Sequence, residues 1–221
     1  YSVKFSRYIY LLNLSYILFS ILKYLFFLFV VLLFSKKIKL IRNNFSLVID
    51  DIQNQNEFDR WSDLEDNFTE TETLYITRFL PKETEQRKNV ISRRTLHGYD
   101  RGSILNEGIK NLIGDILYLI SISFKININL IHLHSHFIND YFYYHSLFKI
   151  CNAKYMIQDR NLGRTNALKN YLFKSSGGIA SSCIQKNIAQ HNGNALFYDI
   201  DIFFAYGDKT VEDIMNLGAR I

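Results

Sequence analysis

The alternation of strand and helix patterns over residues 128–219 is the feature that most constrains the fold. Apolar runs rich in β-branched and aromatic residues alternate with amphipathic stretches, and Gly177, Gly178 and Gly218 close two of the expected helices. The expected strands are "INLIHLHS", "AKYMIQDRN", "IASSCIQKN" and "YDIDIFFAYG", and the expected helices are "NDYFYYHSLFKICN", "TNALKNYLFKSSGG" and "KTVEDIMNLGA". This order predicts βαβ units, and therefore a parallel sheet with helices on its faces.

Two further strands are expected upstream of this region. The segment "FSLVIDDI" (45–52) predicts a buried strand that runs into two carboxylates, and "ETLYITRFL" (72–80) predicts another. The acidic, turn-rich segment between them indicates a solvated loop or a short helix, and residues 101–124 carry apolar side chains at helical spacing. We therefore expect residues 44–221 to form an α/β, Rossmann-like domain.

The N-terminal part of the chain is strongly apolar. Residues 8–34 form an apolar run interrupted only by Asn13, a few serines and Lys23. Such a run exceeds the roughly 20 residues that a transmembrane helix needs, although a charge at mid-span is costly. The alternative is that these residues form buried helices of a soluble core. We expect residues 1–43 to be a hydrophobic, membrane-associated helical segment.

The distribution of charge bears on both location and partners. Residues 1–49 contain seven of the 26 basic residues and no acidic residue, which leaves 19 basic and 21 acidic residues in the rest of the chain. The nearly neutral remainder argues against a nucleic-acid-binding face. The basic cluster at 36–42 would place the C-terminal part in the cytoplasm by the positive-inside rule. The two cysteines are isolated, which argues against a disulfide-built secreted domain.

Four of the six histidines lie within residues 130–148. On a strand, His132, His134 and His136 would share one face, and this pattern is similar to the His-x-His of metal-dependent hydrolases of the PHP and amidohydrolase type. A catalytic zinc site would need further ligands in a tetrahedral arrangement. The favoured interpretation is a strand whose histidines line a cleft or lie under helices, with no metal; the metal-dependent hydrolase remains an alternative.

Ligands of parallel sheets bind at the carboxyl ends of the strands, so the polar residues that follow each expected strand are candidate site residues. Arg164 lies just before an expected helix, whose N-terminus and nearby arginines suit an anion such as phosphate. The other candidates at these positions are His136, Asp159, Arg160, Asn161, Gln185, Lys186 and Gly207.

The segments "YMIQDRNLGRTNALKNYLFKSSGG", "LFKSSGGIASSCIQKN" and "YDIDIFFAYGDKTVEDIMNLGARI" resemble the N-terminal half of GT-B glycosyltransferases of bacterial surface and capsular polysaccharide biosynthesis. The resemblance covers about residues 125–221. One departure is Gln185-Lys186-Asn187, where relatives often have Gln-His-Gly. The resemblance implies an acceptor-side domain, with the donor-binding domain beyond Ile221, so that the sequence would be an inactive fragment of a longer enzyme.

This resemblance implies metal-independent, inverting sugar transfer from a nucleotide-sugar to a glycan or lipid-linked acceptor, without a further cofactor. Asp159 or His136 would act as the base, and Arg160, Asn161 and Gln185 would contact ligand. Membrane attachment at the cytoplasmic face of the bacterial inner membrane fits a lipid-linked acceptor. A non-enzymatic, membrane-anchored α/β binding protein is the other alternative.

Overall fold

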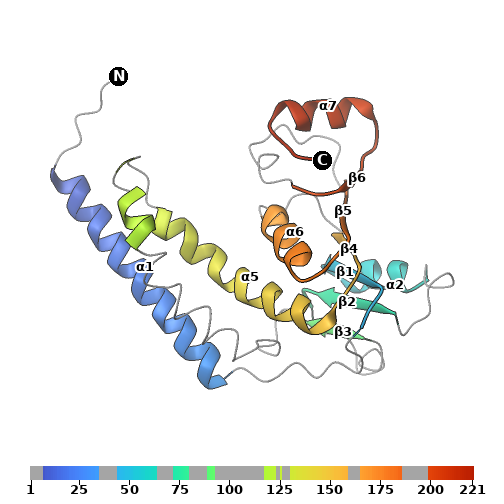
Figure 1. The fold of residues 1–221 in the computed structure, drawn as a ribbon, viewed down its shortest axis with the longest axis horizontal. Coiled ribbons are helices and arrows are strands. Elements are labelled where there is room, and N and C mark those ends of the chain that lie inside the picture. The colour runs from blue at the N-terminus through green and yellow to red at the C-terminus, as the bar shows by residue number, and fades with distance from the viewer. Residues whose placement is uncertain are drawn as a thin grey trace. The chain divides into compact units, whose positions relative to one another are not determined.

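The sheet is fully parallel, as the strand and helix alternation predicts. The computed structural model describes residues 7–34, 44–63, 72–79, 89–92, 117–122, 125, 130–158, 165–185 and 199–221. Six strands pair in the order β3-β2-β1-β4-β5-β6, and every pairing is parallel (Figure 1). The strands are β1 (Leu47–Ile52), β2 (Thr73–Thr77), β3 (Val90–Ser92), β4 (Tyr155–Gln158), β5 (Ala180–Ile184) and β6 (Ile202–Phe204). The prediction of a Rossmann-like parallel α/β fold is confirmed.

The named helices are α1 (Arg7–Phe34), α2 (Gln55–Asp63), α5 (Leu130–Cys151), α6 (Asn166–Ser175) and α7 (Asp208–Asn216). The chain divides into two compact units. The helical unit comprises Tyr1–Lys37 and Gly98–Tyr143, and the sheet unit comprises Ile38–His97 and Tyr144–Ile221. The sheet and the last two turns of α5 thus belong to one unit, which can be described by itself.

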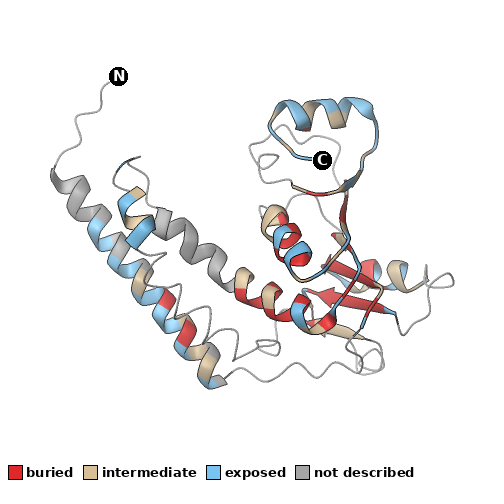
Figure 2. Cartoon of the chain, in the orientation of Figure 1, coloured by how far each residue is buried: buried red, intermediate tan, exposed pale blue. Residues whose placement is uncertain are grey.

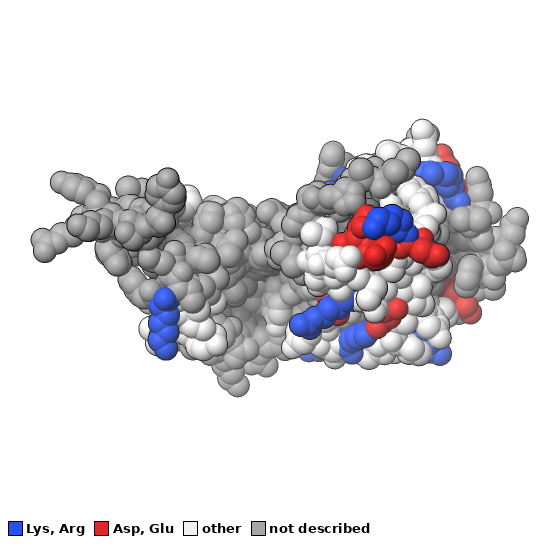
Figure 3. Space-filling model, turned by 90° about the horizontal axis from the view of Figure 1, so that it is seen from above, with Lys and Arg blue, Asp and Glu red and all other residues white. Residues whose placement is uncertain are grey.

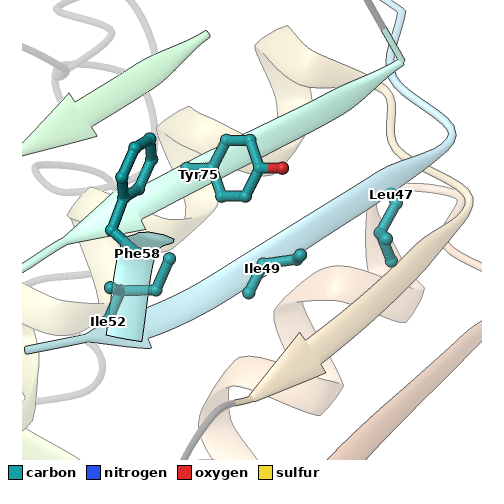
Figure 4. Packing of buried hydrophobic residues seen from close by; sticks show 5 residues of the cluster. All are labelled: Leu47, Ile49, Ile52, Phe58 and Tyr75. Carbon is teal, nitrogen blue, oxygen red and sulfur yellow. The ribbon is translucent and has the colours of Figure 1, made fainter. Parts of the chain in front are cut away.

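A bulge in β1 shapes the core between the sheet and α2. Leu47, Ile49 and Ile52 pack with Phe58 of α2 and Tyr75 of β2 in one hydrophobic cluster (Figure 4). Leu47 and Ile49 are two positions apart, as strand alternation requires, but Ile49 and Ile52 are three positions apart. The register to β2 shifts between Ile49 and Ile52, so one extra residue is accommodated in β1.

Most predicted elements of the sheet unit are confirmed. The strands β1, β2, β4, β5 and β6 and the helix α6 lie within the segments expected for them, and α7 begins one residue before its expected segment. Gly177 and Gly218 have φ values of 95° and 102°, in the left-handed region that glycine tolerates after a helix. The short strand β3 was not predicted, and most of the expected helix at 101–124 lies outside the described residues, although residues 117–122 are helical.

The prediction of a strand at 128–135 is wrong, because α5 begins at Leu130. The sequence contains neither Gly nor Pro between residues 125 and 151, so nothing interrupts a helix there. Near its C-terminal end α5 buries Tyr144, Leu147 and Phe148, at the helical spacing of three and four residues. The apolar alternation before them was compatible with either structure, and the continuous helix prevails.

Residues 8–34 form one helix, α1. Among the described residues, no helix is long and apolar enough to cross a membrane, so the membrane-spanning interpretation of this run is not supported.

The face of the molecule seen in Figure 3 carries interspersed acidic and basic side chains in its described part rather than a basic patch.

Candidate functional site

The strand order reverses direction between β1 and β4, since β2 and β3 lie on one side of β1 and β4 to β6 lie on the other. The crevice outside the carboxyl ends of the strands at such a reversal is the usual ligand site of open parallel sheets. Asp50 of β1, Gln158 of β4 and Cys183 of β5 stand in register near these ends. Polar side chains on adjacent strands therefore meet where a ligand is expected.

Asp50 is held by two donors on a single carboxylate oxygen. Its Oδ2 lies 2.6 Å from the Lys169 ammonium of α6, and the Tyr144 hydroxyl of α5 donates a hydrogen bond to the same oxygen at 2.8 Å. The Lys169 ammonium also lies 5.1 Å from the centre of the Tyr144 ring, within the range of a cation–π contact. All three side chains are at most 1% exposed. This is a buried, charge-assisted cluster built from three elements.

The second carboxylate reaches the same lysine because of the bulge in β1. Asp51 has a φ of 74°, and its Oδ2 lies 3.6 Å from the Lys169 ammonium. Successive side chains of a regular strand point to opposite faces, so Asp51 would otherwise share the α2 face with Ile49. The left-handed residue turns Asp51 toward Lys169 and gives the core position to Ile52. Such strained conformations cost about 1–3 kcal/mol and persist where surrounding contacts determine them.

Arg78 balances the second carboxylate. Its guanidinium lies 2.5 Å from Asp51 Oδ1, and its Nε donates to the same oxygen. Arg78 follows β2 and is half exposed, so it brings the edge of the cluster to the surface. The two carboxylates and the two cations sum to no net charge.

One carboxylate oxygen of the cluster accepts no hydrogen bond from the described residues. Asp50 Oδ1 is buried and has no hydrogen-bond partner in the part of the chain that is described. On the adjacent strand β4, Gln158 Oε1 accepts a hydrogen bond from the Asn166 amide of α6 at 2.6 Å. Gln158 Nε2 and Asn166 Oδ1 similarly lack partners among the described atoms. Buried polar atoms in native proteins are nearly always paired, so these three atoms indicate a place for a polar ligand or water.

The turn after β1 does not suit a dinucleotide. The sequence from 50 to 58 contains no glycine and three carboxylates, whereas a pyrophosphate is normally bound by a glycine-rich turn at a helix N-terminus. The first turn of α2 is already capped: Asn54 Oδ1 accepts from the Glu57 amide at 3.0 Å, and the Glu57 carboxylate accepts from the Gln53 amide at 2.8 Å. The site thus offers carboxylates to hydroxyl groups rather than amides to phosphate.

Two of the predicted site residues lie at strand ends in the described structure. Gln185 follows β5, is buried, and accepts a hydrogen bond from the Tyr206 amide at 2.8 Å through Oε1, so this oxygen ties β5 to the end of β6. Gly207 precedes α7 and is exposed, with open space where a Cβ would lie. The other predicted positions Asp159, Arg160, Asn161, Arg164 and Lys186 lie outside the described residues.

The expected position of His136 at a strand end is wrong, because it lies within α5. Because these residues belong to a helix, the two-residue alternation that would give a strand one face of three histidines does not apply. Within the described residues, no group of three or more metal-ligating side chains could hold a metal ion.

Sequence reasoning missed Asp50, Tyr144 and Lys169 as site residues. Asp50 had a readable signal, because a buried strand running into carboxylates is itself a polar strand end. Lys169 had a weaker one: it occupies an inward position of α6, three residues before Leu172 and four before Phe173, both buried. Tyr144 had none, since nothing in an aromatic-rich helix marks the hydroxyl that meets a carboxylate.

Cys151 is not a candidate nucleophile. Cys151 and Cys183 are both buried and form no disulfide. Burial raises the pKa of the Cys151 thiol to about 11. The thiol is therefore protonated at neutral pH and unreactive.

The comparisons with known proteins give no match, so the assignment of a function depends on the geometry described above. No family model matches the sequence, and neither a curated protein nor a solved structure matches the chain.

Proposed function

We propose that this chain is part of a glycosyltransferase of surface polysaccharide biosynthesis, in which the carboxyl edge of the sheet binds the acceptor. The observation that supports the proposal is the pair Asp50 and Asp51 at the strand-order reversal, held against Lys169 and Tyr144 with one Asp50 oxygen left over. Carboxylates accept hydrogen bonds from sugar hydroxyls and act as general bases.

In the proposed reaction, Asp50 takes the role of base that the sequence analysis gave to Asp159 or His136. Its Oδ1 accepts the proton of the acceptor hydroxyl while the hydroxyl oxygen attacks the anomeric carbon of a nucleotide-sugar. The bond from the anomeric carbon to the phosphate oxygen breaks, and the nucleoside diphosphate leaves with the electron pair. Lys169 and Tyr144 hold Oδ2 and so fix the direction of Oδ1.

The acidic turn after β1 agrees with an acceptor site rather than a nucleotide site. Asp50 and Asp51 already balance Lys169 and Arg78. Glu57 adds a negative charge near the N-terminus of α2, which is unfavourable for a diphosphate. Sugar hydroxyls carry no charge and can donate to these carboxylates. The proposed reaction uses a nucleotide-sugar donor and a glycan or lipid-linked acceptor. It needs no metal or further cofactor.

Ligand binding by the whole chain tests the proposal. We expect saturation-transfer difference NMR with a panel of oligosaccharides and nucleotide-sugars to detect at least one ligand. Asp50→Asn should weaken that binding by about tenfold or more, because an amide supplies a neutral oxygen in place of the carboxylate.

Asp201→Asn is the matched control. Asp201 is also a carboxylate bonded to a lysine of α6, but it lies at the opposite edge of the sheet. Its substitution should leave ligand binding unchanged. If no sugar or nucleotide-sugar binds, or if both variants bind as the unsubstituted chain does, the acceptor-site assignment is wrong and the Asp50 cluster is a structural ion pair.

A further inference from the structure

The helix α1 exposes a continuous apolar face. Leu18, Leu22, Leu25, Phe29 and Leu33 follow one another at steps of three or four residues, which places them on one side of a helix, and each is 45–61% exposed. Leu14, Phe19 and Phe26 widen this face and are 56–68% exposed. These eight side chains are named the α1 apolar face, and most of the described length of α1 is drawn as exposed in Figure 2.

The other side of α1 is covered within the helical unit. Tyr24 and Leu28, four residues apart, are both 5% exposed, and the ring of Phe27 stacks on Phe142 of α5 with 6.4 Å between centroids. The helix therefore has a protein-facing side and an outward side, and both are apolar. Contiguous exposed apolar surfaces of this length mark an interaction site.

The charge around this helix indicates its partner. Residues 1–49 carry seven basic residues and no acidic one, and four of the seven, Lys36, Lys37, Lys39 and Arg42, directly follow α1 in the sequence. Basic residues beside an apolar helix face complement anionic lipid headgroups. Lys23 is the one charged residue between positions 8 and 34, and it is exposed on the helix. A lysine at such a position extends its ammonium to the headgroups while its alkyl chain lies along the apolar surface.

We infer that the α1 apolar face binds the surface of an anionic lipid bilayer, with α1 lying in the plane of the interface. The apolar side chains enter the boundary between headgroups and acyl chains, and the protein-facing side keeps its contact with α5. The inference is independent of the sugar chemistry proposed for the sheet unit, and it commits to lipid rather than to a second copy of the chain.

Vesicle flotation tests this directly. The whole chain is mixed with vesicles of phosphatidylcholine alone or with phosphatidylglycerol added, at low and at high salt. We expect binding to the anionic vesicles, weaker binding to the neutral ones, and a decrease with salt because the basic residues are screened. The double variant Leu22→Glu, Phe26→Glu should reduce binding by about tenfold or more, since two exposed apolar side chains that would enter the bilayer are replaced by side chains with the same sign of charge as the lipid.

Tyr171→Glu is the control, because Tyr171 is 64% exposed on α6 of the sheet unit. It should bind vesicles as the unsubstituted chain does, and circular dichroism should show all variants folded alike. The inference is overturned if the chain binds neither kind of vesicle, or if the α1 double variant binds as well as the control. If the chain binds no vesicles and is instead a dimer, and if the double variant is a monomer, the α1 apolar face binds a second copy of the chain.

Discussion

Two lysines of α6 pair with aspartates at opposite edges of the same sheet, in very different surroundings. At the carboxyl edge, Lys169 and Asp50 are 1% and 0% exposed. At the amino edge, Lys174 and Asp201 are 45% and 27% exposed, and Asp201 Oδ2 also accepts from the Ser181 amide at 2.8 Å. The exposed aspartate thus has a protein partner on each oxygen, whereas the buried one keeps an oxygen without a partner in the described part of the chain. The same pair of residue types therefore serves as a surface tether at one edge and as a candidate site at the other.

Removal of the buried lysine should have the largest effect. Lys169→Met leaves Asp50 and Asp51 buried without their shared cation, so we expect a loss of about 3–5 kcal/mol in the free energy of unfolding. Urea unfolding followed by circular dichroism measures it. The double variant Asp50→Leu, Lys169→Met should recover part of the loss, because no buried charge of the pair remains. A loss as small as that of an exposed pair would contradict the burial described for this cluster.

The second effect concerns the hydroxyl on Asp50. Tyr144→Phe removes one donor to a buried carboxylate and keeps the ring, and should cost about 1.5–3 kcal/mol in unfolding free energy. Tyr171→Phe is the control on an exposed tyrosine and should change stability by less than about 0.5 kcal/mol. Equal effects of the two substitutions would show that the Tyr144 hydroxyl does not stabilise Asp50.

The bulge in β1 can be tested with two substitutions at one position. Asp51→Gly and Asp51→Ala both remove the carboxylate, but only alanine keeps the penalty of a left-handed φ. We expect the glycine variant to be more stable than the alanine variant by about 1–2 kcal/mol in the same unfolding experiment. Equal stabilities would mean that residue 51 has an ordinary strand conformation in solution.

The exposed pair should show the smallest effect. Lys174→Met is expected to cost less than about 1 kcal/mol, because water screens the pair and the lysine loses side-chain entropy in forming it. The cost should decrease as salt is added. A salt-independent loss similar to that of Lys169→Met would remove the distinction between the two edges.

The sequence predicts those parts of the fold that local signals delimit. β4, α6, β5 and β6 follow one another with glycines and polar turns at their ends, and they form where expected. The first half of α5 was predicted as a strand because short apolar alternation fits both periods, and only the long uninterrupted context favours the helix. β3 has three residues, too few for a periodic pattern.

The candidate site was predictable only in part. The position of Asp50 at the end of a buried strand can be read from the sequence, but its pairing with Lys169 joins residues 119 positions apart and depends on the sheet order. The left-handed φ of Asp51 is similarly invisible, because nothing local in "VIDDIQ" distinguishes a bulge from a regular strand end.

The two lysines of α6 also have a mechanical consequence. Because Lys169 is bonded at the carboxyl edge and Lys174 at the amino edge, the helix is fixed to the sheet at two points about one and a half turns apart. A ligand that displaces Lys169 from Asp50 would therefore remove one of these two contacts and leave the other in place. We expect it to shift the first turn of α6 more than the last, which keeps the Lys174–Asp201 contact, so that the displacement is larger at the site than at the opposite edge.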